Sequence, residues 1–136
     1  MVITTHIMLK GIGLSTLREF LLRTLQEMRL NIVEEEESVT SLSILAIEKR
    51  IPSWQIYLTS LIGPSLFRDR VGLKIWAFDE GDFISIKIEA RLYIPELDIE
   101  NPRGGDRERL RAAGTARLLI RELEHSFSID SSDISG

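Results

Sequence analysis

The sequence predicts an α+β domain of two layers, with an antiparallel sheet of five or six strands packed against helices. Two segments, Thr16 to Leu30 and Asp106 to Phe127, carry apolar residues at helical spacing. Between them, from Ile32 to Ile94, apolar and polar residues alternate with the two-residue period of strands. The predicted order is therefore one strand, one helix, four or five strands and a long C-terminal helix.

The N-terminal part predicts a strand followed by a helix. Residues 2 to 9 are rich in β-branched and apolar side chains and end before Gly11 and Gly13. Thr16 and Glu19 have the spacing of a capping box, which favours a helix beginning there. Its apolar face is predicted to carry Leu17, Phe20, Leu21, Leu25 and Met28.

The middle of the chain predicts strands with one apolar face. One strand is expected within Val39 to Lys49, and another after Pro52, before the turn Gly63-Pro64. Their inward side chains are predicted to be Leu42, Ile44 and Ala46 in the first, and Trp54, Ile56, Leu58 and Ile62 in the second.

A β-hairpin is the clearest local prediction. Val71 to Ala77 and Ile84 to Ile94 both alternate, and the turn Asp79-Glu80-Gly81-Asp82 lies between them. The opposite face of the second strand is polar, which predicts a sheet with one face toward the core and one toward water. The polar residues are Ser85, Lys87, Glu89 and Arg91.

The C-terminal helix is expected to begin after Pro95 and a polar loop, with Asp106 as its N-cap, and to continue to about Phe127. Since a one-faced sheet hides its apolar side only beneath helices, both helices are expected on that face. We predict a single domain over residues 1–129, followed by a flexible Ser/Asp-rich tail over 130–136.

Composition limits the compartment and the chemistry. The 136 residues include no cysteine, which excludes disulfides and thiolate ligands and fits a reducing compartment. No basic segment precedes an apolar run at the N-terminus, and no apolar run approaches the ~20 residues that cross a bilayer. We therefore expect a cytoplasmic protein. Few amides, together with 13 arginines against 4 lysines, also suggest a thermophilic source.

Charge is unevenly distributed along the chain. Net charge is −4, which disfavours nucleic acid as a partner. Glu34 to Glu37 form an acidic run, and we expect this run and the arginines to be solvated faces. The arginines of the last helix and its approach are Arg103, Arg107, Arg109, Arg111, Arg117 and Arg121.

No catalytic motif is present in the sequence. The two histidines, His6 and His125, lie at opposite ends of the chain, and phosphate-binding, dinucleotide-binding and zinc-protease patterns are absent. We therefore predict no cofactor, no metal and no catalytic residues. An enzyme is a further hypothesis, ranked below the two functions given at the end of this section, because no acid, base or nucleophile can be named.

The order of elements resembles the helix-grip fold of the START and birch-pollen-allergen proteins, and more distantly a repeat of the TATA-binding protein. The resemblance is carried by the Thr16 to Leu30 helix, the Val71 to Ile94 hairpin and the Asp106 to Phe127 helix. The larger helix-grip proteins have extra elements after the first helix, and several small archaeal proteins look like the shorter version without them. The resemblance implies a cavity between the sheet and the last helix, often used for apolar ligands.

The last helix gives candidates for such a site. Its inward face is expected to carry small side chains first, Ala113 and Ala116, and then Ile120, Leu123 and Phe127. Two arrangements are compatible with this pattern: the helix packs closely on the sheet at the alanines, or space remains beneath them. Arg109 is the charged residue on this face, and it either meets an anionic group of a ligand or pairs with an acidic strand residue such as Glu89.

Aromatic residues give candidates for an interface. By alternation, Trp76, Phe78, Phe83 and Tyr93 point away from the core, where they would suit a homodimer contact. The preferred function is a small non-enzymatic binding domain that holds an apolar or amphipathic ligand between sheet and C-terminal helix. The alternative is a structural or protein-interaction homodimer without a ligand pocket.

Overall fold

The computed structural model describes residues 3–50, 54, 69–95, 97–127 and 129–133. Its elements follow the predicted order of strand, helix, strands and long helix, with a further short strand at the end. They are β1 (Ile3–Leu9), α1 (Leu14–Glu27), β2 (Leu30–Glu37), β3 (Ser41–Glu48), β4 (Arg70–Asp79), β5 (Ile84–Tyr93), α3 (Asp106–Ser126) and β6 (Ile129–Asp133).

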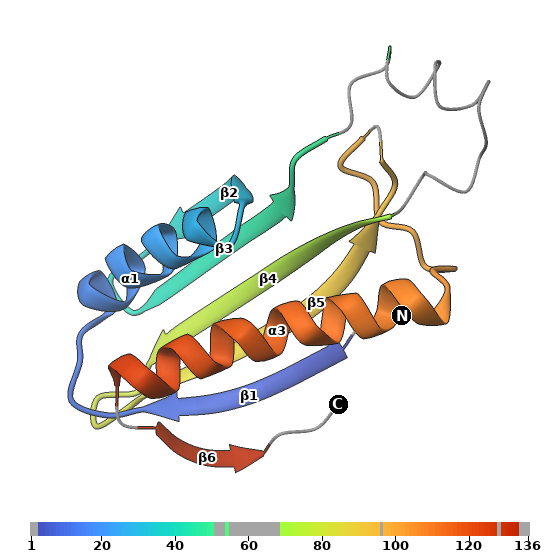
Figure 1. Cartoon of the computed structure of the whole chain (residues 1–136). Helices are drawn as coiled ribbons and strands as arrows, with labels where there is room; N and C mark the ends of the chain where they lie inside the picture. Colours follow the sequence, from blue (N-terminus) through green and yellow to red (C-terminus); the bar gives the residue numbers. More distant parts are fainter. Residues whose placement is uncertain (1–2, 51–53, 55–68, 96, 128, 134–136) are drawn as a thin grey trace.

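The strands form one antiparallel sheet in the order β2-β3-β4-β5-β1-β6. The α+β prediction is confirmed, including the helix after the first strand and the long C-terminal helix. Both helices lie on the same face of the sheet: α1 covers β2 and β3, and α3 runs along β4, β5 and β1 (Figure 1). The other face is left without a helix from the described part of the chain, and we call it the helix-free face.

The predicted hairpin is confirmed in detail. β4 and β5 pair from Val71 opposite Leu92 to Asp79 opposite Ile84. Gly81 adopts a φ of +98° in the connecting loop, a conformation that glycine reaches without a Cβ clash.

The core lies between the sheet and the two helices. Alternate sheet residues such as Ile44, Ile75 and Ile86 are fully buried, because their side chains point toward the helical layer. The helices contribute a matching apolar face, and Phe127 meets Phe20 of α1 edge to face with ring centroids 5.0 Å apart. The fully buried helical leucines are Leu17, Leu21, Leu25, Leu119 and Leu123.

Both helices begin earlier than predicted. α1 starts at Leu14, with Gly13 as its N-cap, so the expected capping box at Thr16 and Glu19 does not form and both side chains are exposed. This start brings the carbonyl of Gly13 to the amide of the buried Leu17. Asp106 is the first helical residue of α3 rather than its cap, which is Gly105.

The acidic run Glu34 to Glu37 belongs to β2, an edge strand of the sheet. A shift in register between Ile32 and Glu34 marks an irregularity in the pairing of β2 with β3. Arg18 of α1 bonds to Glu35 and lies 3.3 Å from Glu37. The run therefore places negative charge along an open edge, which discourages pairing with another sheet.

The end of the chain differs from the predicted tail. Ile129–Asp133, largely within the segment 130–136 that was expected to be flexible, forms β6 and pairs with β1. Without β6, β1 would leave a row of backbone groups unpaired at the edge of the sheet, and this pairing supplies their partners. The strand predicted after Pro52 lies outside the described residues, apart from Trp54, whose side chain is exposed. Within the described residues, no helix has the length and apolar character to span a membrane.

Candidate functional site

The strand register arranges the side chains of the helix-free face in rows. One row runs across five strands through Glu36, Ser43, Trp76, Lys87 and His6. Because facing residues in neighbouring strands lie about 5 Å apart, residues of one row are close neighbours. Segments distant in sequence thus meet on this face.

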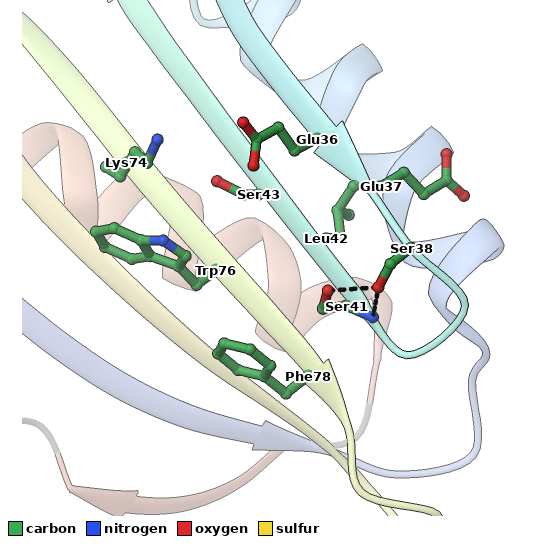
Figure 2. Close-up of a pocket in the computed structure, with 9 residues that line it drawn as sticks. All are labelled: Glu36, Glu37, Ser38, Ser41, Leu42, Ser43, Lys74, Trp76 and Phe78. Carbon is green, nitrogen blue, oxygen red and sulfur yellow. Dashed lines mark hydrogen bonds between the residues drawn. The ribbon is translucent and has the colours of Figure 1, made fainter.

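A groove follows β3 on the helix-free face. Ser41 and Ser43 of β3 have short side chains, whereas the neighbouring strands carry Glu36, Trp76 and Phe78. The hollow has a volume of about 350 Å³, and we call it the β3 groove. Figure 2 shows its lining residues, which are Glu36, Glu37, Ser38, Ser41, Leu42, Ser43, Lys74, Trp76 and Phe78.

The two walls of the β3 groove differ in chemistry. Trp76 and Phe78 form an aromatic wall on β4, and Phe78 is 46 % exposed. On the opposite side, the Glu36 carboxylate points over the groove toward Ser43 (Figure 2). Glu36 has no hydrogen-bond or ion-pair partner among the described residues, whereas Lys74 lies 3.6 Å from Glu34. The groove therefore combines aromatic surface with an uncompensated acceptor.

Three cations lie close to the Trp76 ring. Lys87, Lys74 and Arg91 lie 5.1, 5.6 and 5.9 Å from the ring centroid. Such contacts hold the indole through the attraction of its electron-rich face for positive charge. They fix the orientation of the aromatic wall.

Glu89 holds two of these cations in place. Its carboxylate accepts hydrogen bonds from Arg91 and lies 3.1 Å from the Lys87 ammonium. Burial alone would raise the pKa of Glu89, but the hydrogen bonds from Arg91 and Lys87 outweigh it, so the pKa lies below its ordinary value. Glu89 therefore stays ionised beside Trp76 at neutral pH.

The other predicted interface aromatics lie apart from the groove. Tyr93 is 4 % exposed, and its burial raises the pKa of the phenol. Phe83 is half-buried in the loop of the hairpin. Of the four aromatics named from the sequence, Trp76 and Phe78 are the two that meet at the β3 groove.

A second hollow, of about 330 Å³, lies at the opposite end of the same face. It is dominated by an ion network in which Asp98 accepts hydrogen bonds from Arg50 and from the buried Arg70. Arg70 also donates to the backbone carbonyl of Glu48 at 2.8 Å. Because these groups already satisfy one another, this hollow offers fewer free polar contacts than the β3 groove.

The expected ligand residues of the last helix lie on the other side of the sheet. Arg109 is partly exposed, and its nearest acid is Asp106 at 3.7 Å. Its Nε atom is buried and has no hydrogen-bond partner in the described part of the chain. The suggested pairing of Arg109 with Glu89 is wrong, because β5 alternates and Glu89 points to the helix-free face while α3 packs on the other.

The alanines of α3 pack against the sheet. Ala116 is 3 % exposed and Ala113 only half-buried, whereas Ala112 is 2 % exposed. The buried stripe is therefore turned from Ala113 toward Ala112 and Leu119. The sheet residues beneath, such as Leu73, Ile88 and Ala90, are at most 1 % exposed.

One contact of α3 with the sheet was not predicted. Arg111 donates two hydrogen bonds to the Glu48 carboxylate, at 2.8 and 2.9 Å, and a third to the carbonyl of Asp69. Glu48 also accepts from the backbone amide of Val71. The pair joins α3 to the ends of β3 and β4, and a separation of 63 residues left no local signal for it.

Three residues of the β3 groove, Glu36, Ser41 and Ser43, were also missed. The alternation of serines with Leu42 and Ile44 was visible, but the register that sets them between Glu36 and Trp76 was not. Within the described residues, no cluster of three or more histidine, aspartate or glutamate side chains is arranged to hold a metal ion. No protein-family model, curated protein or solved structure matches the chain.

Proposed function

We propose that this chain is a small non-enzymatic binding domain whose ligand occupies the β3 groove on the helix-free face. The observation that carries the proposal is a hollow of about 350 Å³ with an aromatic wall, Trp76 and Phe78, on one side and on the other the carboxylate of Glu36, which has no partner among the described residues. The size is at the lower end of the range for small-molecule sites, ~300–1,000 Å³.

The chemistry of the groove defines the class of ligand. Aromatic rings bind a flat or apolar molecular face by stacking, and they confer orientation as well as contact area. Glu36 accepts hydrogen bonds only, so it favours a ligand group that donates them. We therefore propose a small molecule with one apolar face and hydrogen-bond donors along an edge.

Binding without catalysis fits the side chains in the groove. A serine nucleophile requires a neighbouring base to activate it, and no histidine is among the residues that line this hollow. The hydroxyls of Ser38 and Ser41 lie 2.6 Å apart and are hydrogen-bonded to each other.

Packing beneath α3 favours the groove over a site between sheet and helix. Side chains that line an open cavity stay accessible to a water-sized sphere, but Ala116 and the sheet residues below it are 0–3 % exposed. The Nε atom of Arg109 nevertheless has no hydrogen-bond partner within the residues that the structure describes, so a ligand on that side is tested in the same experiment.

A second candidate function is self-association through the helix-free face. An acidic strip on β2, Glu34 and Glu36, lies beside a basic strip formed by Lys74, Lys87 and Arg91. A two-fold axis places the same patch of both copies in contact, so opposite strips would face each other. Trp76 would then lie near the centre of the contact.

Native mass spectrometry of the purified full chain, read for subunit number and retained small molecules, tests both candidates. For the groove, we expect a monomer with a reproducible bound mass that is lost in Trp76→Ala and Glu36→Gln. Trp54→Ala, at the other and exposed tryptophan, is the matched control. In Trp54→Phe, Trp76 is the sole tryptophan. The retained compound is extracted and added back to this variant, and a shift in the fluorescence emission of Trp76 locates the site.

The other outcomes separate the alternatives. A bound mass that survives Trp76→Ala but is lost in Ala116→Leu or Arg109→Met would place the ligand beneath α3 and refute the groove. An empty dimer that becomes monomeric in Trp76→Glu would support self-association instead.

A further inference from the structure

The solvent side of α3 and of its approach carries exposed arginines without an ion-pair partner among the described residues. Six arginines of the described residues pair with acids, and two of them, Arg109 and Arg111, belong to α3; the set is Arg18, Arg50, Arg70, Arg91, Arg109 and Arg111. By contrast, none of the exposed arginines on α3 and its approach forms an ion pair in the described part of the chain; these are Arg103, Arg107, Arg117 and Arg121. The surface is thus positively charged in an acidic protein.

Two leucines on the same side of α3 are strongly exposed. Leu110 is 73 % and Leu118 51 % exposed, and Gly114 lies midway between them. At a spacing of four residues these positions follow one side of the helix, about 12 Å from end to end. Exposed leucines at this spacing are typical of a face that packs against another helix.

Gly114 has no role in packing among the described residues. A Cβ atom added there would meet no atom within 4 Å, and glycine inside a helix costs about 0.5–1 kcal/mol relative to alanine. The residue is therefore not explained by the fold. At the centre of an exposed apolar face, it permits a partner backbone to approach closely.

The charges on α3 are segregated around Gly114. At about 100° per residue, Arg107 and Arg121 project within about 20° of Gly114 and the two leucines within about 40°. The acids Asp106, Glu122 and Glu124 lie about 80° away, at the borders. We call Arg107, Leu110, Gly114, Leu118 and Arg121 the α3 ridge.

A second copy of this chain is a poor occupant for the α3 ridge. Two antiparallel α3 helices crossing at Gly114 would place Arg107 of one copy beside Arg121 of the other. Like charges in close contact are destabilising, so the symmetric pairing is disfavoured. The occupant must bring negative charge.

We propose that the α3 ridge docks an acidic amphipathic helix of a partner protein. The partner's apolar stripe packs on Leu110 and Leu118 across Gly114, and flanking carboxylates pair with Arg107 and Arg121. An anionic membrane is less suitable, because α1 in the same layer exposes Glu19 and Glu27. A nucleic acid would bind the arginines through its phosphates, but it would not account for the two exposed leucines. The ridge lies on the opposite side of the molecule from the β3 groove, so this proposal is independent of the proposed function.

The test uses the full chain and a fluorescent synthetic helix of ~20 residues, about the length of α3, with leucines on one face and glutamates on the rest. A second peptide carries lysine in place of every glutamate. Binding is measured by fluorescence anisotropy at low and high salt. The native chain is expected to bind the acidic peptide at least tenfold tighter than the basic one, and more weakly as salt rises.

Variants of the ridge make the test specific. Leu110→Ser with Leu118→Ser should weaken binding of the acidic peptide at least tenfold, and Arg107→Glu with Arg121→Glu should reverse the preference toward the basic peptide. Arg23→Glu with Arg29→Glu changes the net charge equally at exposed positions of the α1 side and should keep the original preference. Circular dichroism confirms that each variant is folded.

Three results would overturn the proposal: equal or absent binding of the two peptides, a preference that both charge swaps reverse alike, or peptide binding unchanged by the leucine substitutions. Vesicles of phosphatidylcholine with phosphatidylglycerol and a short DNA duplex serve as further probes. Tighter ridge-dependent binding to either would also refute a protein helix as the occupant.

Discussion

The ring of Tyr93 on β5 lies over Gly72 on the neighbouring strand β4. A Cβ atom added to Gly72 would clash with Cε2 of the ring, lie 2.9 Å from its Cδ2 and 3.2 Å from Cγ1 of Ile47. Tyr93 and Ile47 are 4 % and 0 % exposed although both belong to the helix-free face. The glycine thus creates the space in which a small apolar cluster forms outside the main core.

Replacing Gly72 should destabilise the protein. Gly72→Ala places a methyl group against the Tyr93 ring, which must shift in a site closed by Ile47, and such overpacking costs about 1–3 kcal/mol. Urea denaturation at neutral pH measures the change in the free energy of unfolding. A neutral result would mean that the ring moves away without loss of packing.

Gly114→Ala is the matched control and should have the opposite sign. The new methyl group meets open space, and alanine is favoured over glycine within a helix by about 0.5–1 kcal/mol. The same denaturation experiment should show this variant to be more stable than the native chain. A loss of stability would indicate a packing role for Gly114 within the chain.

Ala116→Leu distinguishes close packing from an open cavity beneath α3. Ala116 is 3 % exposed, so three added carbon atoms should overpack the core and cost about 1–3 kcal/mol. Ala113→Leu, at a half-buried position of the same helix, should cost less. Thermal denaturation of both variants checks the order. Equal stability of Ala116→Leu and the native chain would reveal space that a ligand could fill.

Local patterns in the sequence were sufficient for much of the fold. The β4–β5 hairpin follows from its turn and from side chains that alternate on both strands, and the helices follow from apolar spacing. These signals act within a few residues. The buried face of α3 is centred nearer to Ala112 than to Ala113, which was predicted to face inward. A stripe of small and large side chains defines the rotation of a helix about its axis only coarsely.

The β3 groove required information that no local pattern contains. The outward direction of Trp76 and Phe78 was predicted by alternation, but their partners depend on the register between β2, β3 and β4. Glu36 reaches Trp76 across Ser43 through two strand pairings. The pairing of β6 with β1 was also missed. A short Ser/Asp-rich segment has a weak propensity for strand, and it forms β6 because it pairs with β1, a contact that no local pattern predicts.

Arg109→Met should leave the protein as stable as the native chain or more stable. The buried Nε atom of Arg109 has no hydrogen-bond partner among the described residues, and an unsatisfied buried donor costs about 1–3 kcal/mol. Methionine keeps the length of the side chain and removes the donor. Urea denaturation in the absence of added ligand measures the effect. A clear loss of stability would show that Arg109 makes a stabilising interaction.

The Arg111 and Glu48 side chains should show coupled effects on stability. Their hydrogen bonds join α3 to β3, and each group is at least partly shielded from water. Arg111→Met and Glu48→Gln are each expected to destabilise, and the double variant should lose about 0.5–2 kcal/mol less than the sum. A double-mutant cycle by urea denaturation gives this coupling energy. Additive losses would mean that the contact contributes nothing beyond its two separate side chains.

Asp98 should make stability fall in acid. Hydrogen bonds from Arg50 and then Arg70 hold the pKa of its carboxyl below the ordinary value, despite the opposing effect of burial. A lowered folded-state pKa means that the unfolded chain binds the proton first as pH falls. The stabilisation is therefore complete above about pH 4, the ordinary aspartate value, and is lost as pH falls through the folded-state pKa.

Asp98→Asn should accordingly flatten the acid limb of the stability curve and lower stability at neutral pH by about 1–3 kcal/mol, because the buried Arg70 loses its charged acceptor. Urea denaturation from neutral pH to below pH 4 compares the two proteins. Arg50→Met tests the cause: it keeps Arg70 as a partner but removes the largest contribution, so carboxyl NMR should show the pKa of Asp98 rising toward its ordinary value. Parallel stability curves for the native chain and Asp98→Asn would exclude this network as a source of the acid dependence.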